Sequence, residues 1–338
     1  MFNNGTKEAN ICNVWADFIN YFTAGIYVFP IIFFVILLLL IVSLRRAFHP
    51  FFSILFLLFL SIYIACDAIY LPYKLSSVIN ENSRLSNTLC AITDFTYFLI
   101  TPLGTYCTVE RIVATILFRS YERQRHWAFF LVTFPICVLF ACAMAFQYVN
   151  DEKFSEIVDQ SLVFFSVFNI LSLIILYLIN RYFIRKCSHA NFSNLSMRYQ
   201  LAENVKAVYL LLPILFLDNL ITINDMIWYG VAQIDSYFDP WYCKRIDGYF
   251  VFYIIGTTIS FLLELSMPIV VLARHELLRK KIQQITRKVM LKFPRKSSTT
   301  IIPISPSSRS VKLKNVFGDE IVKEISISEY FDRLKAQW

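Results

Sequence analysis

The stretch AGIYVFPIIFFVILLLLIVSLRR, residues 24–46, is a long apolar run that ends in two arginines. An α-helix rises 1.5 Å per residue, so about 20 apolar residues cross a hydrocarbon core roughly 30 Å thick. Residues 24–44 reach that length without a charged side chain. A membrane-spanning strand would instead show about ten residues of alternating polarity. The segment therefore predicts a transmembrane helix followed by a basic connection.

Similar runs recur along the whole chain. The composition, 57% hydrophobic and 17% charged, is too apolar for a soluble domain. The seven predicted spans are residues 24–44, 51–71, 89–117, 127–146, 162–179, 207–229 and 249–272. The predicted fold class is an all-α membrane protein, a bundle of seven transmembrane helices.

The basic residues predict how the bundle is oriented. Of the 32 Lys and Arg, 26 lie in the connections after the first, third and fifth spans and in the tail, and the other six lie on the opposite side. Cytoplasmic connections carry the excess of positive charge, so the N-terminus is predicted outside and the C-terminus in the cytoplasm. This bias and a basic tail beside an anionic leaflet account for the net charge of +8. No nucleic-acid partner is expected.

The spans divide the chain into four predicted parts. They are an extracellular N-terminus (1–23), the transmembrane domain (24–272), an amphipathic juxtamembrane helix (273–293) and a largely flexible cytoplasmic tail (294–338). Asn4 begins a glycosylation sequon on the outer side. In 273–293 an apolar stripe opposes a basic face, which favours binding to membrane lipid on the inner surface. Calmodulin binding is the less favoured alternative.

The outer side also carries the cysteines that can form a disulfide. Cys12, Cys90 and Cys243 face the oxidising compartment, and the connection between the fourth and fifth spans has no cysteine. Three cysteines allow three single disulfides, among which the sequence does not choose.

Every charged residue inside the predicted spans, apart from an arginine at the inner mouth of the third, is an acid. An acid in hydrocarbon is costly and is by default a candidate functional residue. Asp67, Asp94 and Asp225 are predicted to surround an outward-opening cavity and to bind a small-molecule ligand. Asp218 and Glu264 are predicted to lie deeper, as interior polar residues. The alternative for all five is hydrogen bonding between helices.

An acid and an arginine stand side by side at the end of the third span. Arg111 lies 21 residues after Cys90, about 31 Å of helix, which places it at the cytoplasmic mouth of the bundle. One interpretation of Arg111 is that it is an ordinary cytoplasmic arginine of the positive-inside bias. The adjacent Glu110 favours an ionic contact that can lock and open.

Two motifs give the chain a family resemblance. VERIVATILFRSYE (109–122), NLSMRYQLAENVKAVYLL (194–211) and a tail ending EYFDRLKAQW resemble the nematode seven-helix chemoreceptors of the serpentine receptor Sra group, class epsilon in particular. The resemblance implies a G protein-coupled receptor for environmental chemicals in sensory neurons, with Glu110 and Arg111 as its acid-arginine pair. No residue of a ligand site carries over.

The resemblance also implies a coupling surface for a heterotrimeric G protein. We take its residues to be Glu110, Arg111, Tyr121, Arg198, Gln200, Glu203 and Asn204. In the resting state Glu203 is predicted to accept a hydrogen bond from Arg111. The implied location is the plasma membrane of sensory cilia, and the partners are a ligand, lipid and, in a homo- or hetero-dimer, a second receptor.

The sequence holds no enzyme motif. The four histidines all flank spans on the cytoplasmic side, and no glycine-rich phosphate loop is present, so neither an enzyme activity nor a metal or other cofactor is expected. The alternative function is a transporter or cation channel that uses the intramembrane acids. Seven spans without an internal repeat argue against it.

Overall fold

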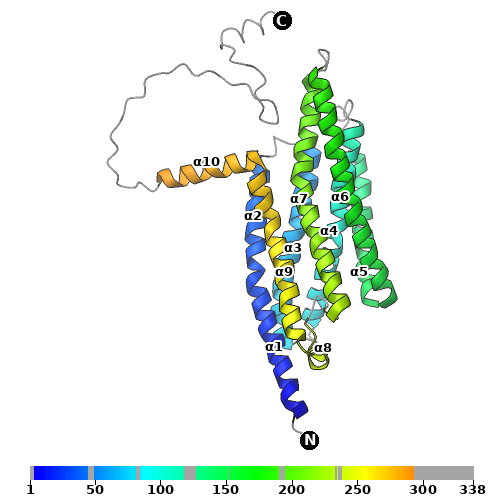
Figure 1. The fold of residues 1–338 in the computed structure, drawn as a ribbon, viewed down its shortest axis with the longest axis vertical. Coiled ribbons are helices and arrows are strands. Elements are labelled where there is room, and N and C mark those ends of the chain that lie inside the picture. Colours follow the sequence, from blue (N-terminus) through cyan, green and yellow to red (C-terminus); the bar gives the residue numbers. More distant parts are fainter. Residues whose placement is uncertain are drawn as a thin grey trace, which may run out of the picture. The chain divides into compact units, whose positions relative to one another are not determined.

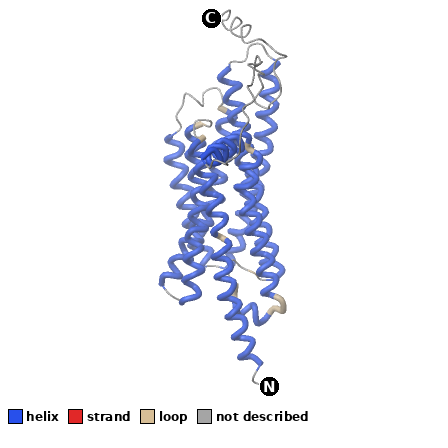
Figure 2. Tube along the Cα trace, turned by 90° about the vertical axis from the view of Figure 1, so that its left-hand side faces the viewer, coloured by secondary structure: helices blue, strands red, loops and turns tan. Residues whose placement is uncertain are grey.

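The computed structural model describes residues 4–44, 49–80, 84–117, 127–150, 152–189, 195–232, 234 and 238–292. All regular structure in these residues is helical (Figures 1 and 2). The helices are α1 (Asn4–Ile26), α2 (Val28–Ser43), α3 (Pro50–Asn80), α4 (Arg84–Ile116), α5 (Trp127–Asn150), α6 (Glu152–His189), α7 (Leu195–Ala232), α8 (Pro240–Arg245), α9 (Tyr249–Arg274) and α10 (Glu276–Lys292).

All seven predicted spans fall on these helices. The end of α1 and α2 form the first span, and α3, α4, α5, α6, α7 and α9 form the others. Five stretches within these helices are long and apolar enough to cross a bilayer, and α5 contributes a shorter apolar one, Val132–Phe146. The all-helical membrane bundle that the sequence predicted is confirmed.

The helix α4 is not among the five stretches that are apolar enough to cross a bilayer, and its position in the bundle explains why. It packs against α3, α5, α6 and α7, so few of its faces can meet lipid. Its buried side chains include those of Thr93, Thr96 and Thr108 as well as the pair Glu110 and Arg111. A helix enclosed by other helices needs no apolar surface all round, and polar side chains there bond to neighbouring helices.

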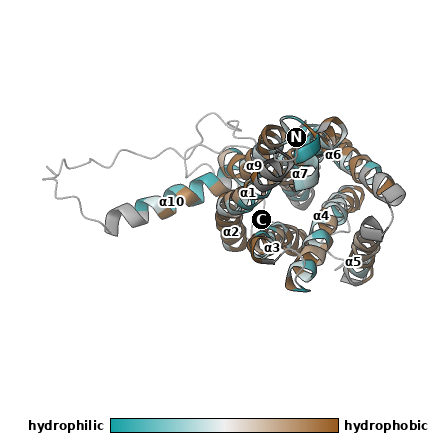
Figure 3. Cartoon of the chain, turned by 90° about the horizontal axis from the view of Figure 1, so that it is seen from below, coloured by the Kyte–Doolittle hydropathy of each residue, from teal (hydrophilic) through white to brown (hydrophobic). Residues whose placement is uncertain are grey.

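Large apolar side chains cover the outside of the bundle instead. Leu39 of α2, Leu139 of α5, Phe164 of α6 and Leu262 of α9 are all more than half exposed. In Figure 3, which colours each residue by its hydropathy, brown hydrophobic residues run along the bundle helices. An exposed apolar belt of this kind is what lipid tails solvate, so the protein is an integral membrane protein.

Several helices continue past the apolar runs from which the spans were predicted. The helix α3 runs nine residues beyond the predicted end at 71, and α6 extends the predicted span 162–179 in both directions. The segment before the first span is also helical, as α1. Apolar run length reports only the part of a helix that hydrocarbon surrounds, and polar residues prolong the same helix into water.

Candidate functional site

The acid and the arginine of α4 form one buried unit. Arg111 Nε donates to Glu110 Oε2 at 2.5 Å, and Nη2 donates to Glu110 Oε1. Both side chains are 1% exposed. Two parallel hydrogen bonds between a guanidinium and a carboxylate fix the orientation of both groups. Glu110 therefore holds the guanidinium in place inside the bundle.

The held guanidinium reaches two other helices. Its Nη1 donates to Asn204 Oδ1 of α7 at 2.9 Å. Its carbon Cζ lies 4.5 Å from the centre of the Phe52 ring of α3, within the range of a cation–π contact. The structure places Asn204, the neighbour of Glu203, in contact with the arginine, and the contact of Arg111 with Glu203 stays a prediction. Arg111 thus joins α3, α4 and α7 at the predicted cytoplasmic end.

The structure describes the side chains of some of the other predicted coupling residues but not of all of them. Gln200 and Glu203 are buried on α7 within one turn of Asn204. Tyr121 lies outside the described residues, as do the side chains of Arg198 and Asn4. Phe52 was missed by the sequence analysis, since an aromatic residue in an apolar run carries no signal of a partner on another helix.

A histidine lies at the junction of α9 and α10, on the same side of the bundle. His275 is 6% exposed, and its backbone N–H closes α9 by donating to the Val271 carbonyl at 3.0 Å. Burial and, to a smaller extent, the positive charge of Lys206 on α7 lower the pKa of its imidazole to about 4, against an opposing effect of Glu276. This histidine is neutral at physiological pH.

The five intramembrane acids come from four helices. Asp67 lies thirteen residues from the outer end of α3 and Glu264 fifteen residues from the outer end of α9, about 20 Å of helix in each case. Asp218 of α7 lies deeper, since it accepts a hydrogen bond from Tyr63, which is one turn further from the outer end of α3 than Asp67. The structure therefore brings Glu264 level with Asp67, whereas the sequence placed it deeper, because α3 is longer at its outer end than its apolar run indicated.

Asp67 and Glu264 are close enough for their carboxyl groups to hydrogen-bond each other. Asp67 is 4% exposed, and no described donor reaches its Oδ2. Tyr27, at the junction of α1 and α2, interacts electrostatically with both carboxyls and with Asp225. Asp94 acts on the Cys66 thiol that also neighbours Asp67, and Cys90 Sγ lies 3.7 Å from Asp94 Oδ2. We call Asp67, Glu264 and Tyr27 the carboxyl site.

The two acids of α7 bond to other helices. The Tyr63 hydroxyl of α3 donates to Asp218 Oδ1 at 2.7 Å. The Ser260 hydroxyl of α9 donates to Asp225 Oδ1, also at 2.7 Å. Both acids therefore also serve the packing role that the sequence analysis weighed as the alternative. Neither donor was singled out from the sequence, because a lone Tyr or Ser in a span is common.

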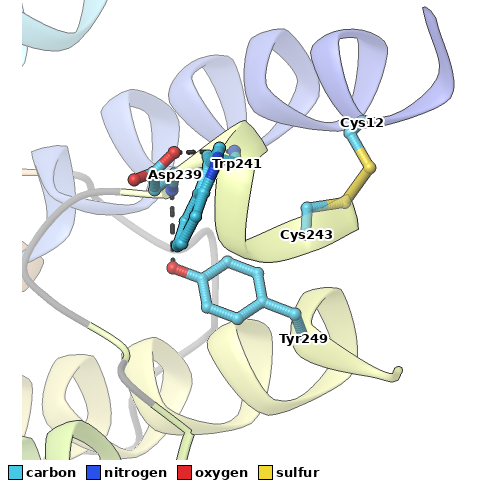
Figure 4. The surroundings of a disulfide bond; sticks show 5 residues. All are labelled: Cys12, Asp239, Trp241, Cys243 and Tyr249. Atoms are coloured by element: carbon cyan, nitrogen blue, oxygen red, sulfur yellow. Dashed lines mark hydrogen bonds between the residues drawn. A yellow bond between two sulfur atoms is a disulfide. The ribbon is translucent and has the colours of Figure 1, made fainter. Parts of the chain in front are cut away.

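A disulfide covers the predicted outer end. Of the three pairings open to the sequence, the structure contains Cys12–Cys243, with Cα atoms 6.0 Å apart. It joins α1 to α8, whose N-cap Asp239 accepts from the Trp241 N–H at 2.7 Å (Figure 4). The Asp239 N–H in turn points to the Tyr249 hydroxyl at 3.4 Å. An outer cluster of Ile19, Ile234, Phe238, Tyr249 and Tyr253 packs beneath the bridge.

Comparison with known proteins identifies the chain. No curated protein matches its sequence. The profile described as Sre G protein-coupled chemoreceptor matches residues 6–338, nearly the whole chain. This agrees with the resemblance drawn from the motifs around Arg111 and Asn204, and with the all-helical membrane bundle. The chain belongs to the Sre G protein-coupled chemoreceptor family.

Proposed function

We propose that this chemoreceptor binds a small environmental chemical among Asp67, Asp94 and Asp225 and activates a heterotrimeric G protein through the cytoplasmic ends of α4, α6 and α7. Membership of a receptor family makes the protein a chemoreceptor of the G protein-coupled type and not an enzyme. What we propose is that the three acids bind the ligand and that the coupling residues contact the G protein.

The contact between Arg111 and Asn204 is the observation that carries the proposal. It joins α4 and α7 where the family places the G protein cleft, and an outward swing of α7 would have to break it. Hydrogen bonds to a charged group each contribute about 1.5–3 kcal/mol. A ligand that binds the open state better by that amount shifts the equilibrium about 10- to 100-fold.

The proposal includes an orientation and a location. The Cys12–Cys243 bridge supports an outer position for α1 and α8, because disulfides persist in oxidising compartments. Glycosylation at Asn4 belongs to the same side. On the other side α10 binds anionic lipid through its basic face. We propose the plasma membrane of sensory cilia as the location, for a monomer or a homo- or hetero-dimer.

One observation favours the transporter or channel alternative. Buried acids on α3, α7 and α9 are the kind of groups that line a cation path. Membership of a receptor family argues against it. A ligand-evoked current in an excised patch without GTP would favour the channel.

The direct test is a chemical screen with a G protein readout. Cells that express the chain with a panel of Gα subunits are exposed to volatile and soluble chemicals, and G protein dissociation is recorded by energy transfer. We expect responses to a narrow set of chemicals that stop when GTP exchange is blocked. Responses that persist under that block would contradict the proposal.

A further inference from the structure

We propose that the ligand of this receptor is a small organic cation, such as a protonated amine, held by the carboxyl groups of Asp67 and Glu264 against the ring of Tyr27. This inference rests on the proposed function, because it names the chemical class that the outer part of the receptor recognises. It is carried by the chemistry of the carboxyl site.

Two carboxyl groups in contact require a positive charge. The Asp67 and Glu264 side chains are within hydrogen-bonding reach of each other inside the bundle. Like charges at that separation repel strongly in a low dielectric. A proton can be shared between them, or a cation can bind both. The pair is therefore poised to accept a cation in exchange for a proton.

The electrostatic surroundings add no positive charge to the pair. Among the described residues, the charges of Asp218 and Asp225 act on Glu264, and Asp67 acts on it through a hydrogen bond. All three residues are acidic. The described residue whose charge acts on Asp67 is Glu264. A cation that entered would meet a negative potential from three helices.

Asp67 also presents a buried acceptor that has no donor when the pair holds no proton. The side chain is 4% exposed, and Oδ2 has no donor among the described residues. A buried acceptor without a donor costs about 1–3 kcal/mol. An ammonium N–H would satisfy Oδ2 and compensate the charge in one step.

Aromatic rings beside the carboxyl pair favour an organic cation over a metal ion. The rings of Tyr27 and Tyr70 lie 5.0 Å apart, and Phe261 lies 6.2 Å from Tyr27. Ring faces attract alkylammonium groups, whose carbon atoms also pack against them. No group of three or more metal-ligating side chains occurs in the described part of the chain.

A lysine in α3 shows that one of these rings, that of Tyr70, already contacts a cation. Lys74 Nζ lies 5.0 Å from the centre of the Tyr70 ring, although the side chain is 2% exposed. Lys74 is seven residues beyond Asp67, about 10 Å of helix toward the outer end. Tyr27 is the ring that interacts with both carboxyl groups of the pair.

Ligand binding to the purified receptor tests the inference without a G protein. The probes are isopentylamine, which is protonated at neutral pH, its neutral analogue isopentyl alcohol, tetramethylammonium chloride and sodium chloride. The readout is the thermal unfolding temperature in lipid nanodiscs at increasing probe concentration. The variants are Asp67→Asn and Glu264→Gln, with Asp17→Asn, an exposed acid of α1, as the control.

We expect the amine to stabilise the native receptor and the Asp17→Asn control, and tetramethylammonium, which has the charge but no N–H donor, to stabilise them less. Affinity should fall about 10- to 100-fold in Asp67→Asn, as for the loss of a charge-assisted hydrogen bond. If that variant does not fold, Glu264→Gln carries the same expectation. Equal stabilisation by the alcohol or by sodium chloride, or an affinity that both variants retain, would overturn the inference.

The two proposals fail in different ways. Cation binding that depends on Asp67 but evokes no G protein response would contradict the proposed function and leave the ligand class standing. Responses through a G protein to neutral chemicals alone, without Asp67-dependent amine binding, would contradict the ligand class and leave the proposed function standing.

Discussion

Arg111 Nη1 donates to Asn204 Oδ1 across 2.9 Å, and this bond links α4 to α7 at the predicted cytoplasmic end of the bundle. Glu110 holds the guanidinium from the preceding position in α4. The arginine therefore has a fixed acceptor on its own helix and a second one on a helix that is proposed to move. Such an arrangement can open without exposing an uncompensated charge.

Removal of the α7 acceptor should activate the receptor. In Asn204→Leu the guanidinium keeps Glu110 but loses its bond to α7, so basal G protein activation should rise about tenfold or more. Basal energy-transfer signals at matched surface expression measure this. The control is Asn169→Leu, which removes a buried bond of 2.9 Å from α6 to Thr105 of α4. A basal signal that stays unchanged in Asn204→Leu would contradict the claim that the bond between Arg111 and Asn204 holds the receptor inactive.

The disulfide should stabilise the outer end as a single unit. Cys12→Ser, Cys243→Ser and the double variant should lose the same amount of stability, about 2–4 kcal/mol, because each removes one bond between distant segments. Thermal unfolding in detergent measures the loss. Cys90→Ser is the matched control and should unfold as the native protein does. A larger loss in Cys90→Ser would indicate a different pairing.

The sequence predicted the fold closely and the contacts poorly. The membrane bundle follows from hydropathy, and the place of Arg111 follows from helix rise, because both depend on local sequence. The contact of Arg111 with Asn204 depends on how α7 is rotated against α4, and the contact of Asp67 with Glu264 depends on the length of α3. Such relations arise from packing between distant segments, which one sequence does not display.

Close packing of α7 on α9 depends on a glycine. A Cβ at Gly256 would lie 2.9 Å from Trp228 Cδ1, and the indole is fixed because its Nε1 donates to Asn224 at 3.0 Å. Gly256→Ala should therefore cost about 1–3 kcal/mol of stability. Gly25→Ala is the control, since nothing lies within 4 Å of its Cβ. Equal unfolding temperatures for the two variants would show that the indole can move aside.

His275 should make stability depend on pH. Its pKa is about 4 in the folded receptor and about 6.5 when unfolded, so the unfolded state binds more protons between these values. Stability should therefore be fully present above about pH 6.5 and be lost as pH falls toward 4. In His275→Gln this part of the pH dependence should disappear from the unfolding curves. Identical pH profiles for both proteins would contradict a buried neutral imidazole.

Replacement of Arg111 by alanine tests the central claim most directly. The measurement is ligand-evoked G protein activation at matched surface expression, with Arg181→Ala of α6, an exposed arginine, as the control. If Arg111 is the element through which the outer site controls the G protein, the Arg111→Ala receptor reaches the surface but does not signal, while the control signals normally. Undiminished signalling by Arg111→Ala would show that the arginine only contributes to the positive-inside bias, and it would contradict the account.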